Sequence, residues 1–117
     1  MKKDIFIFIR HIKDAIESID HFVSGVSKEE FMKNEEKQYA VIRAIEIIGE
    51  AAKNISSDFR KEHSIIAWKE IAGMRDRLIH QYFGVNLERI WIVIEKDLPE
   101  LKIQIVSILK SEEKSKH

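Results

Sequence analysis

Apolar residues recur every three or four positions along most of this chain, the spacing of a helix that buries one face. The pattern predicts long helices over residues 3–23, 36–55 and 87–108, and a further helix over 71–81. The apolar positions are Ile5, Ile9, Ile12, Ile16, Ile19 and Val23 in the first, Val41, Ala44, Ile45, Ile48, Ala51, Ala52 and Ile55 in the second, and Leu87, Ile90, Trp91, Ile94, Leu98, Leu101, Ile105 and Ile108 in the last. No segment carries a convincing strand or hairpin pattern.

Local signals mark the ends of these helices. Gly25 is suited to end the first, and Ser27 with Glu30 matches a capping box that opens a short helix to about Lys33. Asn86 is a natural N-cap for the last helix. Pro99 lies within that helix, and we expect a kink or break near residues 97–98 because proline removes a backbone N–H and clashes with the preceding turn.

Composition agrees with this reading. The 117 residues suit one domain, and 44% hydrophobic with 34% charged residues, one Pro and four Gly indicate a helix-rich protein. We therefore predict an all-α, single-domain helical bundle of about four long helices and one or two short ones. Residues 1–110 form the domain, and 111–117 form a polar C-terminal tail that we expect to be frayed.

Several classes of chemistry are excluded or disfavoured. With no Cys, the chain has no disulfide, thiolate metal site or cysteine nucleophile. Neither zinc-like ligand spacing nor a Gly-rich phosphate loop is visible, so we expect no metal and no cofactor. No apolar run approaches the ~20 residues of a membrane span, and a cytoplasmic location is the default. The formal net charge is zero, so contact with nucleic acid would need a local basic cluster.

The segment from Ile71 to Gly84 gathers most of the reactive side chains. It contains Arg75, then four residues, His80, one residue, and Tyr82. In a helix over 71–81, Asp76 and His80 lie four apart on one face, where the carboxylate would orient the imidazole and raise its pKa. Glu50, on the second long helix, is either part of a solvated acidic edge or faces the Arg75 region.

These side chains also have plain structural readings. Arg75, Asp76 and Arg77 would form an ordinary solvated face with weak ion pairs, and Tyr82 would be a packed aromatic. Residue chemistry alone therefore predicts only a polar site.

The segment from Arg75 to Tyr82 resembles the Arg-x4-His-x-Tyr signature of the HEPN superfamily, and more narrowly its HepT-like branch. One departure is Asp76, where the family often has Asn; the change keeps an acceptor and adds a negative charge. The resemblance covers about residues 5–109 and includes further segments: Gly49 to Ala52, Trp68 to Met74, Phe83 to Val85, Trp91, and Asp97 to Pro99.

The resemblance implies an all-helical homodimer whose motif helices meet across the two-fold axis. Members are often toxins of toxin–antitoxin pairs and act as metal-independent endoribonucleases. Their antitoxin is an MNT-type nucleotidyltransferase that transfers AMP to the motif tyrosine, here Tyr82, and thereby silences the toxin.

The motif chemistry then assigns expected roles. Arg75 and His80 are the catalytic residues: His80 transfers protons, and Arg75 stabilises the phosphorane. Asp76 orients His80, while Arg77 and Lys69 are candidates for holding the RNA backbone. The alternative is a catalytically inert helical module that binds or scaffolds a nucleotidyltransferase or a nucleotide.

Overall fold

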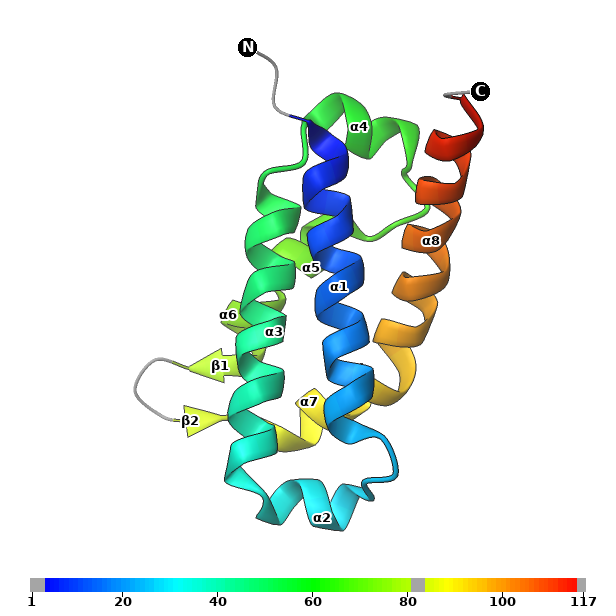
Figure 1. Ribbon diagram of the computed structural model, residues 1–117. Helices are drawn as coiled ribbons and strands as arrows, with labels where there is room; N and C mark the ends of the chain where they lie inside the picture. Colours follow the sequence, from blue (N-terminus) through cyan, green and yellow to red (C-terminus); the bar gives the residue numbers. More distant parts are fainter. Residues whose placement is uncertain (1–3, 81–83, 116–117) are drawn as a thin grey trace.

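The computed structural model of the chain describes residues 4–80 and 84–115. Three helices of 18 or 19 residues dominate this part, and shorter helices close both ends of the bundle (Figure 1). The elements are α1 (Ile5–Val23), α2 (Lys28–Lys33), α3 (Glu35–Lys53), α4 (Ser57–Glu62), α5 (Trp68–Ala72), α6 (Met74–Leu78), β1 (Ile79–His80), β2 (Gly84–Val85), α7 (Leu87–Ile92), the π-helical segment η1 (Val93–Asp97) and α8 (Leu98–Ser115). The predicted all-α class is confirmed.

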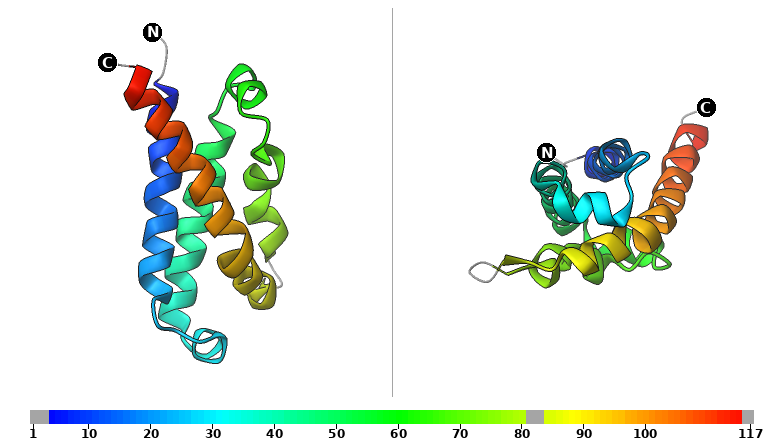
Figure 2. Two further views of the ribbon diagram at one scale, coloured as in Figure 1. Left: turned by 90° about the vertical axis from the view of Figure 1, so that its right-hand side faces the viewer. Right: turned by 90° about the horizontal axis from the view of Figure 1, so that it is seen from below.

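The antiparallel pair of α1 and α3 forms the centre of the bundle. These two helices make the most extensive contact in the described fold, with α8 packed on α1 and with α5 and α6 packed on α3 (Figures 1 and 2). The predicted apolar stripes face this centre: Ile12, Ile16, Ile45 and Ile48 are completely buried. Burial of such stripes is the main favourable term in folding, so it explains why these two helices pair.

The turns around α2 follow the predicted signals. Gly25 has φ +72°, a left-handed conformation that L residues rarely adopt, two residues after α1 ends. The capping box is present: the Ser27 hydroxyl accepts from the Glu30 amide at 3.1 Å, and the Glu30 carboxylate accepts from the Ser27 amide at 3.4 Å. The Asn34 side chain then accepts from the Lys37 amide at 3.0 Å and caps α3.

The C-terminal run from Leu87 to Ser115 contains the predicted distortion before Pro99. Asn86 caps α7 by accepting from the Arg89 amide at 3.1 Å. Immediately before the proline the chain widens into η1, where the Leu98 amide donates to the Val93 carbonyl five residues back. A wider turn relieves the clash of the proline ring, so the helix is distorted rather than broken. Helix α8 continues to Ser115, and residues 111–115 are therefore helical rather than frayed.

The motif segment does not form the expected single helix over 71–81. A turn at Gly73 separates α5 from α6, and the chain becomes extended at Ile79. Two competing contacts explain the change: Ile79 and His80 pair antiparallel with Val85 and Gly84, and the Leu78 carbonyl accepts from the Asn86 amide at 2.9 Å. The fourth long helix of the sequence prediction is thus two five-residue helices and a two-residue strand.

Candidate active site

Arg75 is the motif residue whose side chain the structure places most fully. It projects from α6 toward α3, where its Nε lies 3.4 Å from a carboxylate oxygen of Glu46, and its Nη1 lies 3.2 Å from the neighbouring Asp76. The Arg75 side chain is 38% exposed. Ion pairs this accessible contribute about 0–1 kcal/mol each, so an incoming anion can replace them.

Asp76 and His80 do not share a helical face. That expectation is wrong because α6 ends at Leu78 and His80 belongs to strand β1. The Asp76 carboxylate instead accepts from the Arg75 guanidinium. The His80 side chain and all of Tyr82 lie outside the described part of the structure, so their predicted contacts stay predictions.

A groove of about 370 Å³ is lined mainly by α3 and includes Arg75. Helix α1 contributes Phe8 and His11 to it, and α3 contributes Arg43 and Glu50. Two guanidinium groups, two carboxylates (Glu46 and Glu50), an imidazole and an aromatic ring therefore share one surface hollow. A guanidinium here can bind an anion such as phosphate where that anion displaces a neighbouring carboxylate.

The groove contains Glu50 and adds residues that sequence reasoning missed. Glu50 is exposed and lines the same groove as Arg75, but the carboxylate paired with Arg75 belongs to Glu46, one helical turn earlier. His11 and Arg43 were not singled out from the sequence. The register in which α1 packs on α3 brings these two residues together, and a single sequence does not reveal that register.

Arg77 and Lys69 are placed away from this groove. Arg77 follows Arg75 by two positions, about 200° around a helix of 3.6 residues per turn, so it projects from the opposite side of α6. Its Nη2 donates to the Glu70 carbonyl at 2.7 Å. Lys69 is exposed on α5. The structure therefore does not bring these two cations together with Arg75.

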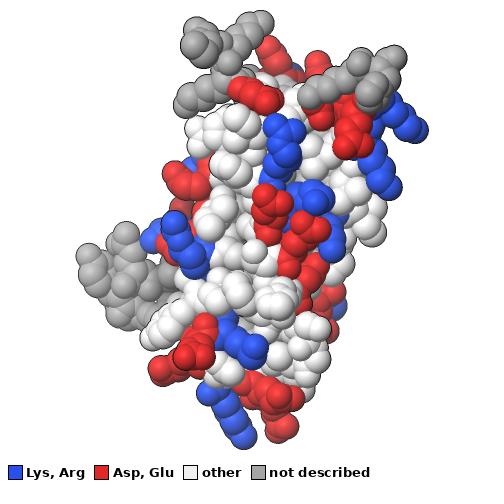
Figure 3. All heavy atoms as spheres, viewed as in Figure 1, with Lys and Arg blue, Asp and Glu red and all other residues white. Residues whose placement is uncertain are grey.

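Positive and negative side chains are intermixed on the surface visible in Figure 3, with broad uncharged areas between them. On the face shown in Figure 3, Lys and Arg side chains alternate with Asp and Glu, in keeping with the zero net charge. Among residues 4–80 and 84–115, no three His, Asp or Glu side chains are grouped to hold a metal ion. No helix within the same ranges is both long and apolar enough to traverse a bilayer.

The family model and the relatives that match this chain indicate the same protein family. The family model described as ribonuclease HepT-like matches residues 12–108. A Methanocaldococcus jannaschii protein named "Gamma-glutamylcyclotransferase and putative RNase MJ0434" is 44% identical over the whole chain, which spans 53% of that relative's length. No solved structure matches the chain significantly.

Two further relatives are similar to the chain over nearly their own full length. "Putative RNase TTE0752" of Caldanaerobacter subterraneus is 49% identical over 90% of this chain and 94% of the relative. "Probable ribonuclease HepT" of Thermococcus cleftensis is 46% identical over 87% of this chain and 93% of the relative.

Proposed function

This chain belongs to the HepT-like ribonuclease family, and on that premise we propose that it is an endoribonuclease that cleaves RNA without a metal ion. The observation that carries the proposal is the accessible Arg75 guanidinium in the α3 groove, whose partners among the described residues are the surface carboxylates of Glu46 and Asp76. A phosphate group can displace those carboxylates because guanidinium binds both anions through the same paired donors.

In the proposed reaction the substrate supplies its own nucleophile. The ribose 2′-oxygen attacks the adjacent phosphorus, the bond to the 5′-oxygen breaks, and a 2′,3′-cyclic phosphate remains. One His80 takes the 2′-hydroxyl proton, and the His80 of a second subunit gives a proton to the leaving 5′-oxygen. Arg75 stabilises the additional negative charge of the phosphorane.

The test of this proposal is RNA cleavage by the purified protein in EDTA. We expect products with 2′,3′-cyclic ends, and we expect Arg75→Ala to lower the rate about 10²–10³-fold, as loss of a transition-state electrostatic contact does. Arg10→Ala is the matched control, because Arg10 lies on α1 and pairs with Asp4. Cleavage that needs added Mg²⁺, or an unchanged rate in Arg75→Ala, would refute the mechanism.

A protein that is unmodified at Tyr82 and still leaves RNA intact would favour the second candidate function. In that case the chain is a catalytically inert helical module that binds or scaffolds a nucleotidyltransferase or a nucleotide. The engagement of Arg75 by both Glu46 and Asp76 is the observation in its favour, since a guanidinium neutralised by two carboxylates attracts phosphate less strongly.

We also propose that the protein is a homodimer joined through the face that carries the Arg75 groove. Ile7 and Ile47 are 44% and 37% exposed on α1 and α3, and Ile47 lines the groove itself. Arg43 and Glu50 lie beside these apolar groups and can pair with the same residues of a second copy, as an isologous interface requires. Such a two-fold contact would bring two motifs to one cleft.

Replacing Ile47 with Asp should convert this dimer to a monomer in sedimentation velocity, because the carboxylate would be buried at the centre of the interface. If both subunits contribute His80, the rate of RNA cleavage should decrease when the dimer dissociates. Ile103→Asp is the control, since Ile103 is 73% exposed on α8. A dimer that survives Ile47→Asp and dissociates with Ile103→Asp would assign the interface to α8 instead.

Finally, we propose that the protein is the toxin of a toxin–antitoxin pair and that an MNT-type nucleotidyltransferase neutralises it. The Tyr82 phenol oxygen would attack the α-phosphorus of ATP, releasing pyrophosphate and leaving AMP on the tyrosine. The added phosphate places bulk and negative charge two residues from His80, where it competes with the RNA phosphate.

A further inference from the structure

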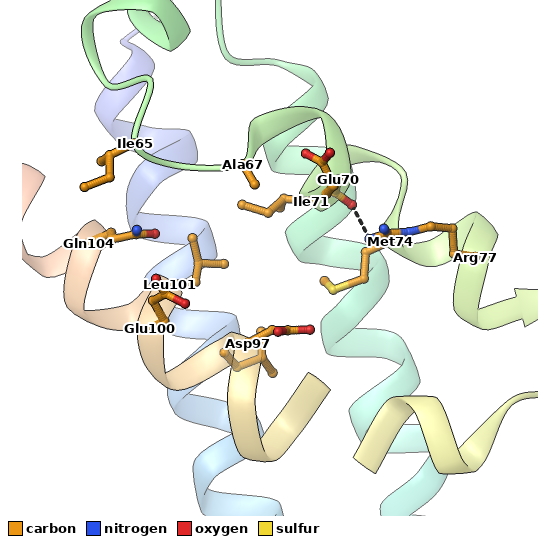
Figure 4. Close-up of a pocket in the computed structure, with 11 residues that line it drawn as sticks. Ile65, Ala67, Glu70, Ile71, Met74, Arg77, Asp97, Glu100, Leu101 and Gln104 are labelled. Carbon is orange, nitrogen blue, oxygen red and sulfur yellow. Dashed lines mark hydrogen bonds between the residues drawn. The ribbon is translucent and has the colours of Figure 1, made fainter. Parts of the chain in front are cut away.

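A second cavity lies on the side of α6 opposite to Arg75. This α6–α8 pocket has a volume of about 290 Å³ and is bounded by α5, α6 and the start of α8 (Figure 4). Its floor consists of the buried apolar side chains Ile71, Met74, Leu98 and Leu101. The floor can therefore remove part of an aliphatic group from water.

The walls of the α6–α8 pocket are predominantly acidic. Glu70 stands on one wall, and Asp97 and Glu100 come from the helical run on the other (Figure 4). Within residues 4–80 and 84–115, none of these three carboxylates has a hydrogen-bond or ion-pair partner. Arg77, the one cation among the described residues that line the pocket, donates to the Glu70 carbonyl at 2.7 Å. Negative charge is thus in excess here although the whole chain is neutral.

We propose that the α6–α8 pocket binds an exposed arginine or lysine side chain of a partner protein. The aliphatic stem of that side chain would lie on Met74 and Leu101, and its cationic head would meet Asp97 and Glu100. Long basic side chains combine these two parts, and an arginine fork can pair with a carboxylate through two hydrogen bonds. A partner seated here contacts α6 on the side opposite to Arg75 and so does not touch the residues of the Arg75 groove.

Two observations favour a protein side chain over other cations. The three carboxylates do not form a group able to hold a metal ion, as none exists among the described residues. Ile65, at the rim, is 81% exposed and offers an apolar shoulder beside the acidic walls. In many interfaces a buried arginine is surrounded by apolar contacts, and an exposed aliphatic group beside a charged pocket can make such contacts with the partner.

The proposal can be tested by titrating the labelled full chain with N-acetyl-arginine methylamide and recording amide chemical shifts. We expect saturating shifts around Met74 and Leu101, with a dissociation constant on the order of millimolar. The citrulline analogue, which has the same shape without the charge, should bind markedly more weakly. Asp97→Asn and Glu100→Gln should each weaken binding about twofold to fivefold. The exposed Glu62 supplies the control, Glu62→Gln, which should leave binding unchanged.

Equal binding of the citrulline analogue, shifts that map elsewhere, or equal losses in the Glu62 control would overturn the proposal. A parallel titration with spermidine distinguishes the other source of the same chemistry: tighter binding of spermidine than of the arginine derivative would assign the pocket to a free polyamine. None of these results depends on RNA cleavage, so this inference and the proposed ribonuclease function stand or fall separately.

Discussion

Replacing His80 with alanine is expected to lower the rate of RNA cleavage about 10²–10⁴-fold, the contribution of a positioned general acid or base. An imidazole titrates near neutral pH and can both accept and donate a proton in one reaction cycle, whereas alanine can do neither. If two His80 side chains act across the two-fold axis, the substitution removes both the base and the acid. Single-turnover cleavage of a labelled RNA by unmodified protein would measure the loss.

The matched control is His21→Ala. His21 is exposed in the last turn of α1, outside the residues that line the Arg75 groove, so its loss should leave the rate near that of the wild type. Circular dichroism of both variants would show that the bundle is intact. His11 is unsuitable as a control because it lines the groove. A His80→Ala protein that cleaves RNA at the wild-type rate would remove His80 from the mechanism.

The long helices were predictable because each one is encoded by its own residues. Ile9, Ile12, Ile16 and Ile19 recur at helical spacing and are all buried, as the stripe requires. The end signals are equally local: a glycine that tolerates positive φ or a serine that caps an amide acts within a few residues. Even the distortion before Pro99 follows from one ring and one missing N–H.

The motif segment was mispredicted because its structure depends on residues outside it. Leu78 and Ile79 are compatible with a helix, but the first gives its carbonyl to Asn86 and the second pairs with Val85. The partners in these contacts lie outside residues 71–81, so no periodicity within that range predicts them. Propensity is a weak preference that such tertiary contacts override.

The family was predictable from the motif residues, whereas the arrangement of their side chains was not. Resemblance singled out Arg75, His80 and Tyr82, and the family is confirmed over residues 12–108. The pairing of Arg75 with Glu46 joins positions 29 residues apart, so it required the packing of α6 on α3. The presence of His11 in the same groove likewise depends on how α1 and α3 are registered.

Replacing Tyr82 with phenylalanine is expected to abolish AMP transfer while largely sparing RNA cleavage. The substitution deletes only the phenol oxygen, which is the nucleophile of the proposed transfer, and keeps the ring. A ring without the hydroxyl cannot form the phosphodiester, so the effect on modification should be complete rather than partial. Intact-mass spectrometry after incubation with an MNT-type nucleotidyltransferase and ATP would reveal the added AMP on the wild-type chain and its absence from the variant.

Tyr39→Phe is the matched control for this experiment, because Tyr39 is 66% exposed on α3 and presents an accessible phenol away from the motif. Modification of Tyr39→Phe but not Tyr82→Phe would assign Tyr82 as the acceptor, and continued transfer to Tyr82→Phe would refute that assignment.

Comparison of the wild-type and Tyr82→Phe proteins also links the modification to toxicity. Wild-type expression should arrest growth and the nucleotidyltransferase should relieve that arrest, whereas the Tyr82→Phe protein should remain toxic because its active site cannot be covered by AMP. Relief of both proteins alike would mean that the antitoxin acts by binding rather than by covalent transfer.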